Sequence, residues 1–594
     1  MDRKTLLALA LTALVVILFQ VLYFAPTERE AYAKRQKALL AQKAPDSLRA
    51  ESGGVSDTAG LAAPSSTEIE AAAEGAGGET QGQPPGPGAP PVGSFVNVTG
   101  ATLQELKVET DLYEATFSSR GGTLTGMKLK RFPAGKGEPV NLVRDVQKGE
   151  IGLIIKSQKG HLDLNSTVFS VSDSVDAKTG RISKLTFLAI DKSGASVRKT
   201  FGFRDGSYVI GLDIELRGIS SQQEKLECLV GWSGGLSLTE TNMKEELRNI
   251  STVSLLGTEL FQDHLGSFKK AASKEHSGNV NVKWTAVRSR YFIAAFIPPE
   301  GSVSKVISFG VPQDTLSGTR LAVPVSASGV TQTAIMLYLG PIDLWKLKEL
   351  GVGLERIVNM GWSWIRPVSQ VILWFLVECH KVLPNYGLVV ILLSALTKIV
   401  FWPLTRSSTK SMREMQKLQP EIQKLREKFK KDPQRLNKEI MGLYKKHKVN
   451  PLGGCLPLLL QMPVFIALYN VLMSAIEMRK ANFVWWINDL SSADTVAVVS
   501  GFSIHMLPLI MGISMFWQQK MTPTDPRQAA MTYFMPILMV LFFYSLPSGL
   551  VLYWTANNFM TIAQQYMMQR SEKGKQTVEP VADEKETQAS KLSA

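Results

Sequence analysis

The sequence has few of the residues that usually carry metal or redox chemistry. Only three cysteines and six histidines occur in 594 residues. The cysteines Cys228, Cys379 and Cys455 lie in different regions, with no CxxC pair and no histidine cluster nearby. This pattern disfavours both zinc sites and a disulfide framework. We therefore expect no metal and no cofactor.

Enzyme motifs are also nearly absent. No Walker loop and no HExxH motif occurs. The segment Gly231–Gly235 (GWSGG) matches G-x-S-x-G formally. A nucleophile elbow, however, requires a strand-to-helix turn in an α/β sheet, and this segment lies in a strand-rich region. The sequence predicts a β-turn there, and a protein that is not an enzyme.

Charge is distributed unevenly along the chain. The formal net charge is +14, and the segment Arg406–Lys448 holds fourteen Lys or Arg against five acids. A basic excess can indicate nucleic acid, anionic lipid or cytoplasmic loops of a membrane protein. This segment is flanked by long apolar runs, which favours the membrane interpretation and no specific nucleic acid.

The N-terminal segment predicts a membrane anchor. Arg3 and Lys4 precede an apolar run, Leu6–Phe24, that has roughly the ~20 residues of a spanning helix. The residues after it make a poor cleavage site, so we expect an uncleaved anchor over residues 1–24 with a cytoplasmic N-terminus. A cleaved signal peptide is the alternative. Residues 25–96, rich in Ala, Gly, Pro and Ser, predict a flexible periplasmic tether.

Residues 97–350 have the texture of an antiparallel β-sandwich. Short alternating segments such as Val108–Phe117, Leu185–Ile190 and Tyr208–Leu216 recur between turn signals such as Gly121-Gly122. Because this region follows an anchor with a cytoplasmic N-terminus, the sequence predicts a large extracytoplasmic all-β domain in the periplasm.

The segment Ile357–Val382 mixes tryptophans with charged residues. Counting it as a span would place Arg406–Lys448 outside the cytoplasm, against the positive-inside rule. We therefore expect an amphipathic interfacial helix at 357–382. Five membrane spans are then predicted at Tyr386–Leu404, Leu456–Met478, Phe502–Trp517, Met531–Leu546 and Leu550–Met567.

With the anchor, these segments predict six transmembrane helices and a cytoplasmic location for both termini. Residues 405–455 between the first two of the five spans predict a charged cytoplasmic hairpin, with helices at Met412–Lys431 and Gln434–Lys446. From periodicity alone, a solvated connector is an alternative for this hairpin. Residues 568–594 are expected to form a cytoplasmic tail.

Lys398 is the most informative residue of the predicted spans. An ionisable side chain inside a span costs a few kcal/mol unless it faces water or a partner, so it is a functional candidate. Snorkelling of the side chain to the lipid headgroups is the alternative. Ser394 lies one turn away, Gln461 lies in the next span, and Asn557 and Asn558 lie in the last. No carboxylate is available within the spans, which favours a hydrated cavity over a packed ion pair.

Several long motifs resemble the YidC/Oxa1/Alb3 family of membrane protein insertases, in its long Gram-negative YidC form. These motifs are Phe401–Thr405 (FWPLT), Met415–Pro420 (MQKLQP), Val449–Pro457 (VNPLGGCLP), Gln461–Phe465 (QMPVF) and Pro547–Tyr553 (PSGLVLY). The resemblance extends to the N-terminal anchor, Arg120–Gly122 and Tyr291–Ala295.

The resemblance implies a five-helix insertase core, with a hydrophilic groove open to cytoplasm and lipid, and a periplasmic β-supersandwich. Lys398 occupies a position where the family usually has arginine, a change that keeps the charge but loses the bidentate guanidinium. Ser394 and Gln461 match groove positions, and Tyr553 and Trp554 match a substrate-contacting slide. Asn558 is a further candidate groove residue.

The function implied by the resemblance is non-enzymatic insertion and folding of integral membrane proteins in the bacterial inner membrane, alone or with the Sec translocon. The implied partners are nascent membrane proteins, Sec components, the lipid bilayer and, transiently, the ribosome. The tail after Met567 mixes both signs of charge, so it does not support ribosome binding. A solute transporter with a periplasmic binding domain is the alternative function.

Overall fold

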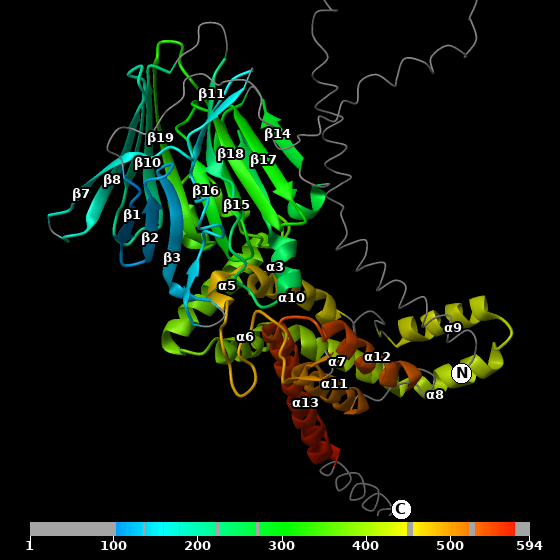
Figure 1. The fold of residues 1–594 in the computed structure, drawn as a ribbon. Helices are drawn as coiled ribbons and strands as arrows, with labels where there is room; N and C mark the ends of the chain where they lie inside the picture. Colours follow the sequence, from blue (N-terminus) through cyan, green and yellow to red (C-terminus); the bar gives the residue numbers. More distant parts are fainter. Residues whose placement is uncertain are drawn as a thin grey trace, which may run out of the picture. The chain divides into compact units, whose positions relative to one another are not determined.

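The computed structural model describes residues 102–576, apart from gaps at 135–136, 159, 178, 220–224, 269–271, 279, 448, 450–455, 500–501 and 522–528. The predicted anchor, the tether and residues 577–594 of the tail lie outside the described residues. Along the described chain, a β domain (102–341) precedes a helical region (342–576) (Figure 1).

The β domain contains antiparallel sheets of nine, six and four strands. The nine-stranded sheet has the order β13 (Glu259–His264), β12 (Ser251–Leu256), β15 (Val282–Arg288), β16 (Phe292–Ile297), β19 (Val330–Pro341), β10 (Val209–Arg217), β9 (Ser196–Gly202), β8 (Ile182–Ile190), β7 (Ser170–Val175). The six-stranded sheet has the order β14 (Ala272–Ser277), β17 (Lys305–Val311), β18 (Leu316–Pro324), β11 (Glu227–Trp232), β5 (Leu153–Lys156), β6 (His161–Asp163). The four-stranded sheet has the order β1 (Glu105–Glu109), β2 (Tyr113–Ser118), β3 (Thr123–Pro133), β4 (Pro139–Asn141). Two short helices complete the domain: α3 (Met243–Asn249) and the 3-10 helix η2 (Leu265–Ser267).

Alternation of apolar and polar residues explains the strands. In β10, Ile210, Leu212 and Ile214 are buried, whereas Gly211 and Asp213 between them are exposed. Successive side chains of a strand point to opposite faces, so this pattern gives one face to the core. The predicted segment Tyr208–Leu216 therefore corresponds closely to β10.

The sheets pack face to face through their apolar sides. The Thr285 hydroxyl of β15 lies 2.7 Å from the Thr319 hydroxyl of β18, which joins the nine-stranded and six-stranded sheets. Phe117 of β2 packs against Phe187 and Phe201 of the nine-stranded sheet, with ring centroids 6.2 and 4.8 Å away. These contacts confirm the predicted sandwich of antiparallel sheets.

One predicted strand was wrong in its extent. The segment Val108–Phe117 is not a single strand, because β1 ends at Glu109 and β2 begins at Tyr113. Between them the Thr110 hydroxyl accepts hydrogen bonds from the backbone N–H groups of Leu112 and Tyr113. The hydrophobic alternation continues through this tight turn, so periodicity alone could not locate it.

A buried lysine holds the Gly121-Gly122 turn in place. Both glycines have positive φ, +68° and +53°, a conformation that side chains disfavour. The fully buried Lys199 ammonium donates to the carbonyl oxygens of Gly121, Gly122 and Ile151 at 3.1, 2.6 and 2.7 Å. The Lys199 nitrogen therefore ties β9 to two loops distant in sequence, and all three of its N–H donors are used while the group is charged.

We expect Lys199→Met to destabilise the β domain by about 3 kcal/mol, because three buried carbonyl groups lose their donor. Burial lowers the pKa of Lys199 from 10.5 to about 7. At a pH between 7 and 10.5, Lys199 is protonated in the unfolded chain and deprotonated in the folded chain. The free energy of unfolding therefore rises with pH, by at most about 1.4 kcal/mol per pH unit. Burial raises the pKa of Glu150 to about 8, which gives the opposite slope below that pH.

Burial raises the pKa of Cys228 from 9.0 to about 12, which gives the opposite slope above about pH 9. The contribution of Lys199 is therefore isolated by comparing the wild type with Lys199→Met from about pH 8.5 to about pH 10. Hydrogen exchange of β9 in the full chain should show wild-type protection that exceeds that of Lys199→Met, by a difference that grows across this window. Equal protection in the two proteins at both pH values would contradict this role.

The G-x-S-x-G match has no catalytic geometry. Trp232 ends β11, and the backbone N–H groups of Ser233 and Gly234 donate to the Glu150 carboxyl group at 2.6 and 2.7 Å. The Ser233 hydroxyl accepts from Arg320, and the helix that follows along the chain begins only at Met243. The segment is a structural bend that encloses a buried carboxyl group.

The helical region consists of helices joined by short connections. They are α4 (Leu344–Glu349), η3 (Leu354–Ile357), α5 (Arg366–Val382), α6 (Tyr386–Val400), α7 (Trp402–Lys417), α8 (Gln419–Lys428), α9 (Pro433–Lys446), α10 (Leu456–Ser474), η5 (Ile476–Met478), α11 (Met506–Met521), α12 (Ala529–Phe543) and α13 (Ser548–Gln576), with a hairpin of β20 (Ala497–Val499) and β21 (Phe502–Ile504). Within the described residues, none of these helices combines the length and apolarity needed to cross a membrane.

The helices differ from the predicted segments at several ends and in two internal breaks. The predicted hairpin helix Met412–Lys431 was wrong as a single helix, because it divides at Leu418 into the end of α7 and the whole of α8, where Pro420 lies in the first turn. The segment Tyr386–Leu404 divides at Phe401, because Pro403 lacks the N–H that would bond to the carbonyl of Ile399. The segment Phe502–Trp517 begins with β21, so its helix starts only at Met506. The helix predicted at 357–382 begins at Arg366, and Pro367 follows in its first turn, where proline is favoured. The membrane spans themselves stay predictions.

Candidate functional site

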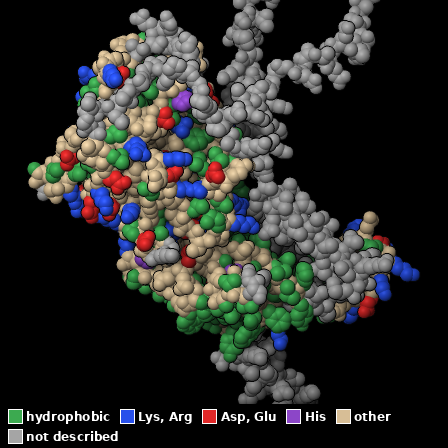
Figure 2. All heavy atoms as spheres, viewed as in Figure 1, with side chains coloured by type: hydrophobic (Ala, Val, Ile, Leu, Met, Phe, Trp, Pro, Cys, Tyr) green, Lys and Arg blue, Asp and Glu red, His purple; other side chains and the backbone are tan. Residues whose placement is uncertain are grey.

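The helical region is apolar on its outside. On α6, the exposed side chains Leu388, Leu392 and Leu396 recur every four residues and so form one stripe. Further exposed apolar side chains lie on α11, α12 and α13: Leu509, Ile513, Phe516, Trp517, Tyr533, Ile537, Leu541, Phe559 and Met567. Figure 2 shows the hydrophobic side chains gathered over this region. A soluble monomer rarely exposes so large an apolar surface.

Polar side chains gather on the inner faces of the same helices. The Lys398 ammonium of α6 donates to the Thr561 hydroxyl of α13 at 2.7 Å. That hydroxyl in turn donates to the carbonyl oxygen of Asn557 at 2.7 Å. Among the described residues, no carboxylate pairs with Lys398, so a hydroxyl is its structural partner.

Tyr553 forms the centre of this polar group. Its hydroxyl lies 3.3 Å from the Thr397 hydroxyl of α6 and accepts a hydrogen bond from the Gln461 amide of α10 at 3.3 Å. The buried Ser394 hydroxyl donates to the Val390 carbonyl at 3.0 Å and approaches the Tyr553 carbonyl at 3.3 Å. Three helices that are distant in sequence therefore meet at one tyrosine.

The polar group continues toward α11. The buried Asn558 amide donates to the Ser514 hydroxyl of α11 at 3.1 Å. Gln564, six residues further along α13, is also buried, and its Nε2 atom has no hydrogen-bond partner among the described residues. We call the whole group the polar seam: Ser394, Thr397, Lys398, Gln461, Ser514, Tyr553, Asn557, Asn558, Thr561 and Gln564.

Trp554 lies on a different face of α13 from the seam. It is half-buried, and its ring packs against Phe465 and Phe543 with centroids 5.4 and 5.3 Å away. Tyr553 is fully buried. The two residues predicted as a sliding surface therefore face different neighbours, and in this conformation only Trp554 is partly exposed.

The structure brings together Ser394, Lys398, Gln461 and Tyr553, and it places Asn558 at the end of the seam near α11. Sequence reasoning missed the seam residues Thr397, Ser514, Thr561 and Gln564. A signal for two of them was present, because Tyr553, Asn557, Thr561 and Gln564 are spaced four, four and three residues apart. That spacing places polar side chains on one helix face.

Two family models match consecutive parts of the chain. The model described as the YidC periplasmic domain matches residues 105–375, and the model described as the 60Kd inner membrane protein matches residues 378–576. The membrane protein insertase YidC of Chlorobaculum parvum is 34% identical over 587 residues, which cover 95% of this chain and 94% of that protein. The chain belongs to the YidC family of membrane protein insertases.

A second YidC relative gives the same result. The membrane protein insertase YidC of Syntrophus aciditrophicus is 33% identical over 584 residues, covering 96% of this chain and all of that protein. A crystal structure of an active YidC insertase with its first transmembrane domain resolved is 19% identical and covers 78% of this chain and 94% of that chain, with a TM-score of 0.36.

Membership of the YidC family assigns the main parts of the chain. The β domain is the YidC periplasmic domain. The helical region from α6 onward lies within the residues that match the 60Kd inner membrane protein model. The function is that of a membrane protein insertase, whose substrates are nascent membrane proteins. Membrane protein insertases are not an enzyme class. The comparisons favour this function over a solute transporter.

Proposed function

We propose that the polar seam is the path along which the polar flank of a client segment passes, while its apolar part moves into lipid. The observation that supports this proposal is that the helices expose apolar side chains on the outside and bring polar side chains together on the inside, the reverse of a soluble protein. Ionisable and polar side chains within membrane helices typically face the bundle interior and mark transport pathways.

Each part of the seam has a role in this proposal. The Lys398 ammonium attracts acidic flanks, because an unpaired cation in a partly desolvated site acts strongly on anions. Ser394, Thr397 and Gln461 exchange their hydrogen bonds with those of the passing backbone. Trp554, partly exposed and amphipathic, offers a surface along which an apolar segment slides into the bilayer.

The charged hairpin of α8 and α9 is proposed to capture clients on the cytoplasmic side. It has a small core of its own, in which Leu418, Ile422 and Val449 are buried. The surface of α8 and α9 carries exposed cations such as Lys424, Lys428 and Lys438. A folded cationic unit beside an apolar bundle suits transient contact with a ribosome.

The proposed topology has six spans, with both termini and the hairpin in the cytoplasm and the β domain in the periplasm. The positive-inside rule supports it, since the cationic hairpin follows α6 directly. The Sec translocon is a proposed partner for clients with large periplasmic parts. Short clients are proposed to need this chain alone.

Insertion by the chain alone tests the proposal. Vesicles that contain only this protein should integrate a newly synthesised two-span client, whereas empty vesicles should not. Saturable uptake of a small solute without any client integration would contradict the proposal and favour a transporter.

Deletion of Met412–Lys446, replaced by a short Gly/Ser linker, should abolish insertion, because the capture surface is lost as a whole. Single substitutions such as Lys424→Ala should have little effect, since exposed charges act weakly one at a time. The measurement is client integration at matched levels of folded protein. Normal integration by the deletion variant would show that the hairpin is a connector only.

A further inference from the structure

A small cavity lies among the first helices of the helical region. It has a volume of about 130 Å³ and is lined by residues of α4, η3 and α5 and the segment between them: Leu344, Trp345, Lys348, Glu355, Arg356, Val358, Met360, Arg366 and Gln370. A cavity that holds a single water molecule needs a volume of only ~10–15 Å³. The cavity is therefore large enough for a polar headgroup, and it lies outside the polar seam.

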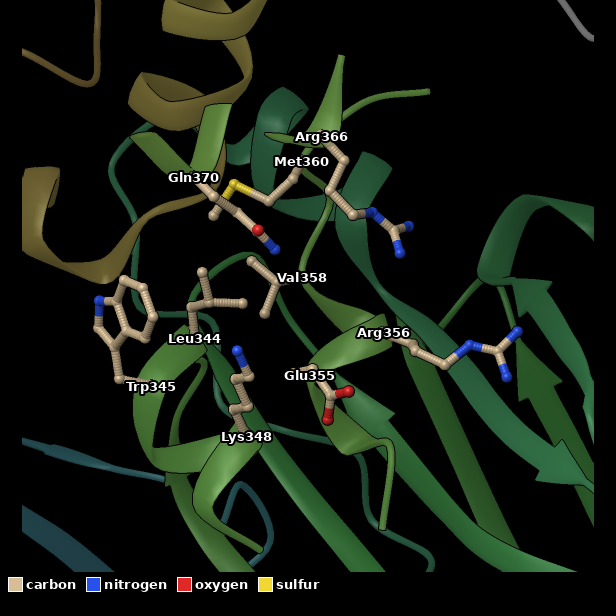
Figure 3. A pocket seen from close by; sticks show the side chains of 9 residues that line it. All are labelled: Leu344, Trp345, Lys348, Glu355, Arg356, Val358, Met360, Arg366 and Gln370. Carbon is tan, nitrogen blue, oxygen red and sulfur yellow. The ribbon is translucent and has the colours of Figure 1, made fainter. Parts of the chain in front are cut away.

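The lining combines an apolar floor with cationic walls. Leu344, Val358 and Met360 are buried and form the floor. Lys348 and Arg366 contribute two positive charges against the one negative charge of Glu355, a formal excess of one, whereas the Arg356 side chain extends away from the hollow (Figure 3). Figure 3 shows the Lys348 ammonium of α4 and the Gln370 amide of α5 directed toward each other across the hollow.

The cationic side chains that line the cavity form no ion pairs among the described residues. Arg356 donates to the Thr258 carbonyl at 3.2 Å, and Lys348 lies over the Trp345 ring at 6.0 Å. Among the described residues, no carboxylate forms an ion pair with Lys348, Arg356 or Arg366. Two cations at one hollow are typical of a site for a phosphate-bearing ligand, because they can donate charge-assisted hydrogen bonds to its oxygens.

The surroundings of the cavity indicate that the ligand is a lipid. Trp362 and Trp364, between η3 and α5, are 47% and 61% exposed and stack with ring centroids 6.0 Å apart. Trp374 on α5 and Trp345 on α4 are exposed as well. Exposed tryptophans gather where a protein surface meets the headgroup layer of a bilayer. A soluble phosphate compound would not need this apolar surround.

We propose that this cavity binds the phosphate headgroup of an anionic glycerophospholipid of the outer leaflet, with its acyl chains along the exposed tryptophans. Lys348 and Arg366 hold the phosphate oxygens, and Glu355 and Gln370 accept hydrogen bonds from headgroup hydroxyls. The proposal rests on the proposed placement of α5 at the periplasmic surface of the membrane. It would fix the β domain at a set height above the bilayer.

The test is native mass spectrometry of the full chain in detergent, titrated with phosphatidylglycerol or with phosphatidylcholine of the same acyl chains. The wild type should bind phosphatidylglycerol at least about tenfold more tightly. Lys348→Gln/Arg366→Gln should lose at least about tenfold of that affinity, since each cation contributes a charge-assisted hydrogen bond. Arg366→Lys should retain most of it.

The matched control is Lys381→Gln/Lys520→Gln, which removes the same charge at exposed positions away from the cavity and should bind as the wild type does. Equal binding of the two lipids by the wild type, or unchanged phosphatidylglycerol binding by Lys348→Gln/Arg366→Gln, would overturn the proposal. Displacement of the lipid by millimolar inorganic phosphate would overturn the lipid as the ligand. Because the assay contains no client, a negative result leaves the proposed insertion path standing.

Discussion

Arg479→Ala should loosen the β domain from the helical region and lower the free energy of unfolding by about 3–5 kcal/mol, the cost of breaking a buried ion pair. Arg479 follows η5, and its Nε atom lies 2.7 Å from the carboxylate of Glu240 in the β domain, with side chains only 2% and 8% exposed. Its guanidinium also donates to the Pro133 carbonyl at 3.0 Å and lies over the Phe292 ring at 5.2 Å. The alanine variant would leave Glu240 charged, buried and unpaired.

The measurement is hydrogen exchange of α3 and of the end of β3, together with thermal unfolding of the full chain in detergent. Arg479→Met/Glu240→Met should recover most of the loss, since an apolar pair of similar volume replaces both charges. Lys381→Ala, which breaks an exposed pair with Glu378, should change stability by less than about 1 kcal/mol. Wild-type exchange and melting in Arg479→Ala would show that this pair does not join the two parts.

The β domain was predictable as a class but not in its strand order. Alternation marks β10 and β8 because one face of each strand is buried. The pairing of β10 with β19, by contrast, joins Val209 to Tyr338 across more than a hundred residues. No local pattern records such a partner. The buried Lys199 was equally invisible, since a lysine in a strand usually indicates the exposed face.

The candidate site shows a similar division. Lys398 was predictable because a charge within an apolar run costs free energy that requires an explanation. Thr561, its hydrogen-bond partner, was not, because a threonine in a helix has no such cost. The identity of the partner depends on how α6 packs on α13, which only the assembled bundle decides. The end of α6 was misplaced for a local reason, the proline at 403.

Lys398→Glu should reduce insertion of clients with acidic flanks by about tenfold or more. The ammonium is held inside the bundle by Thr561, so reversal of its charge places an anion on the proposed path. Like charges repel strongly in a partly desolvated site, and a repulsion of about 1.4 kcal/mol already changes an equilibrium constant tenfold. Lys398→Arg should retain activity, because it keeps the charge. A lysine that only snorkelled to the headgroups would instead tolerate Lys398→Ala or be stabilised by it.

The control for Lys398→Glu is Lys520→Glu, which reverses an exposed cation at the end of α11 and should leave insertion unchanged. Two matched clients are compared, one with an acidic flank and one with that flank neutralised, in vesicles that contain equal amounts of each variant. We expect Lys398→Glu to fail with the acidic client and to insert the neutral one far better. Equal insertion of the acidic client by the wild type and by Lys398→Glu would contradict the proposal that the polar seam carries the client's polar flank.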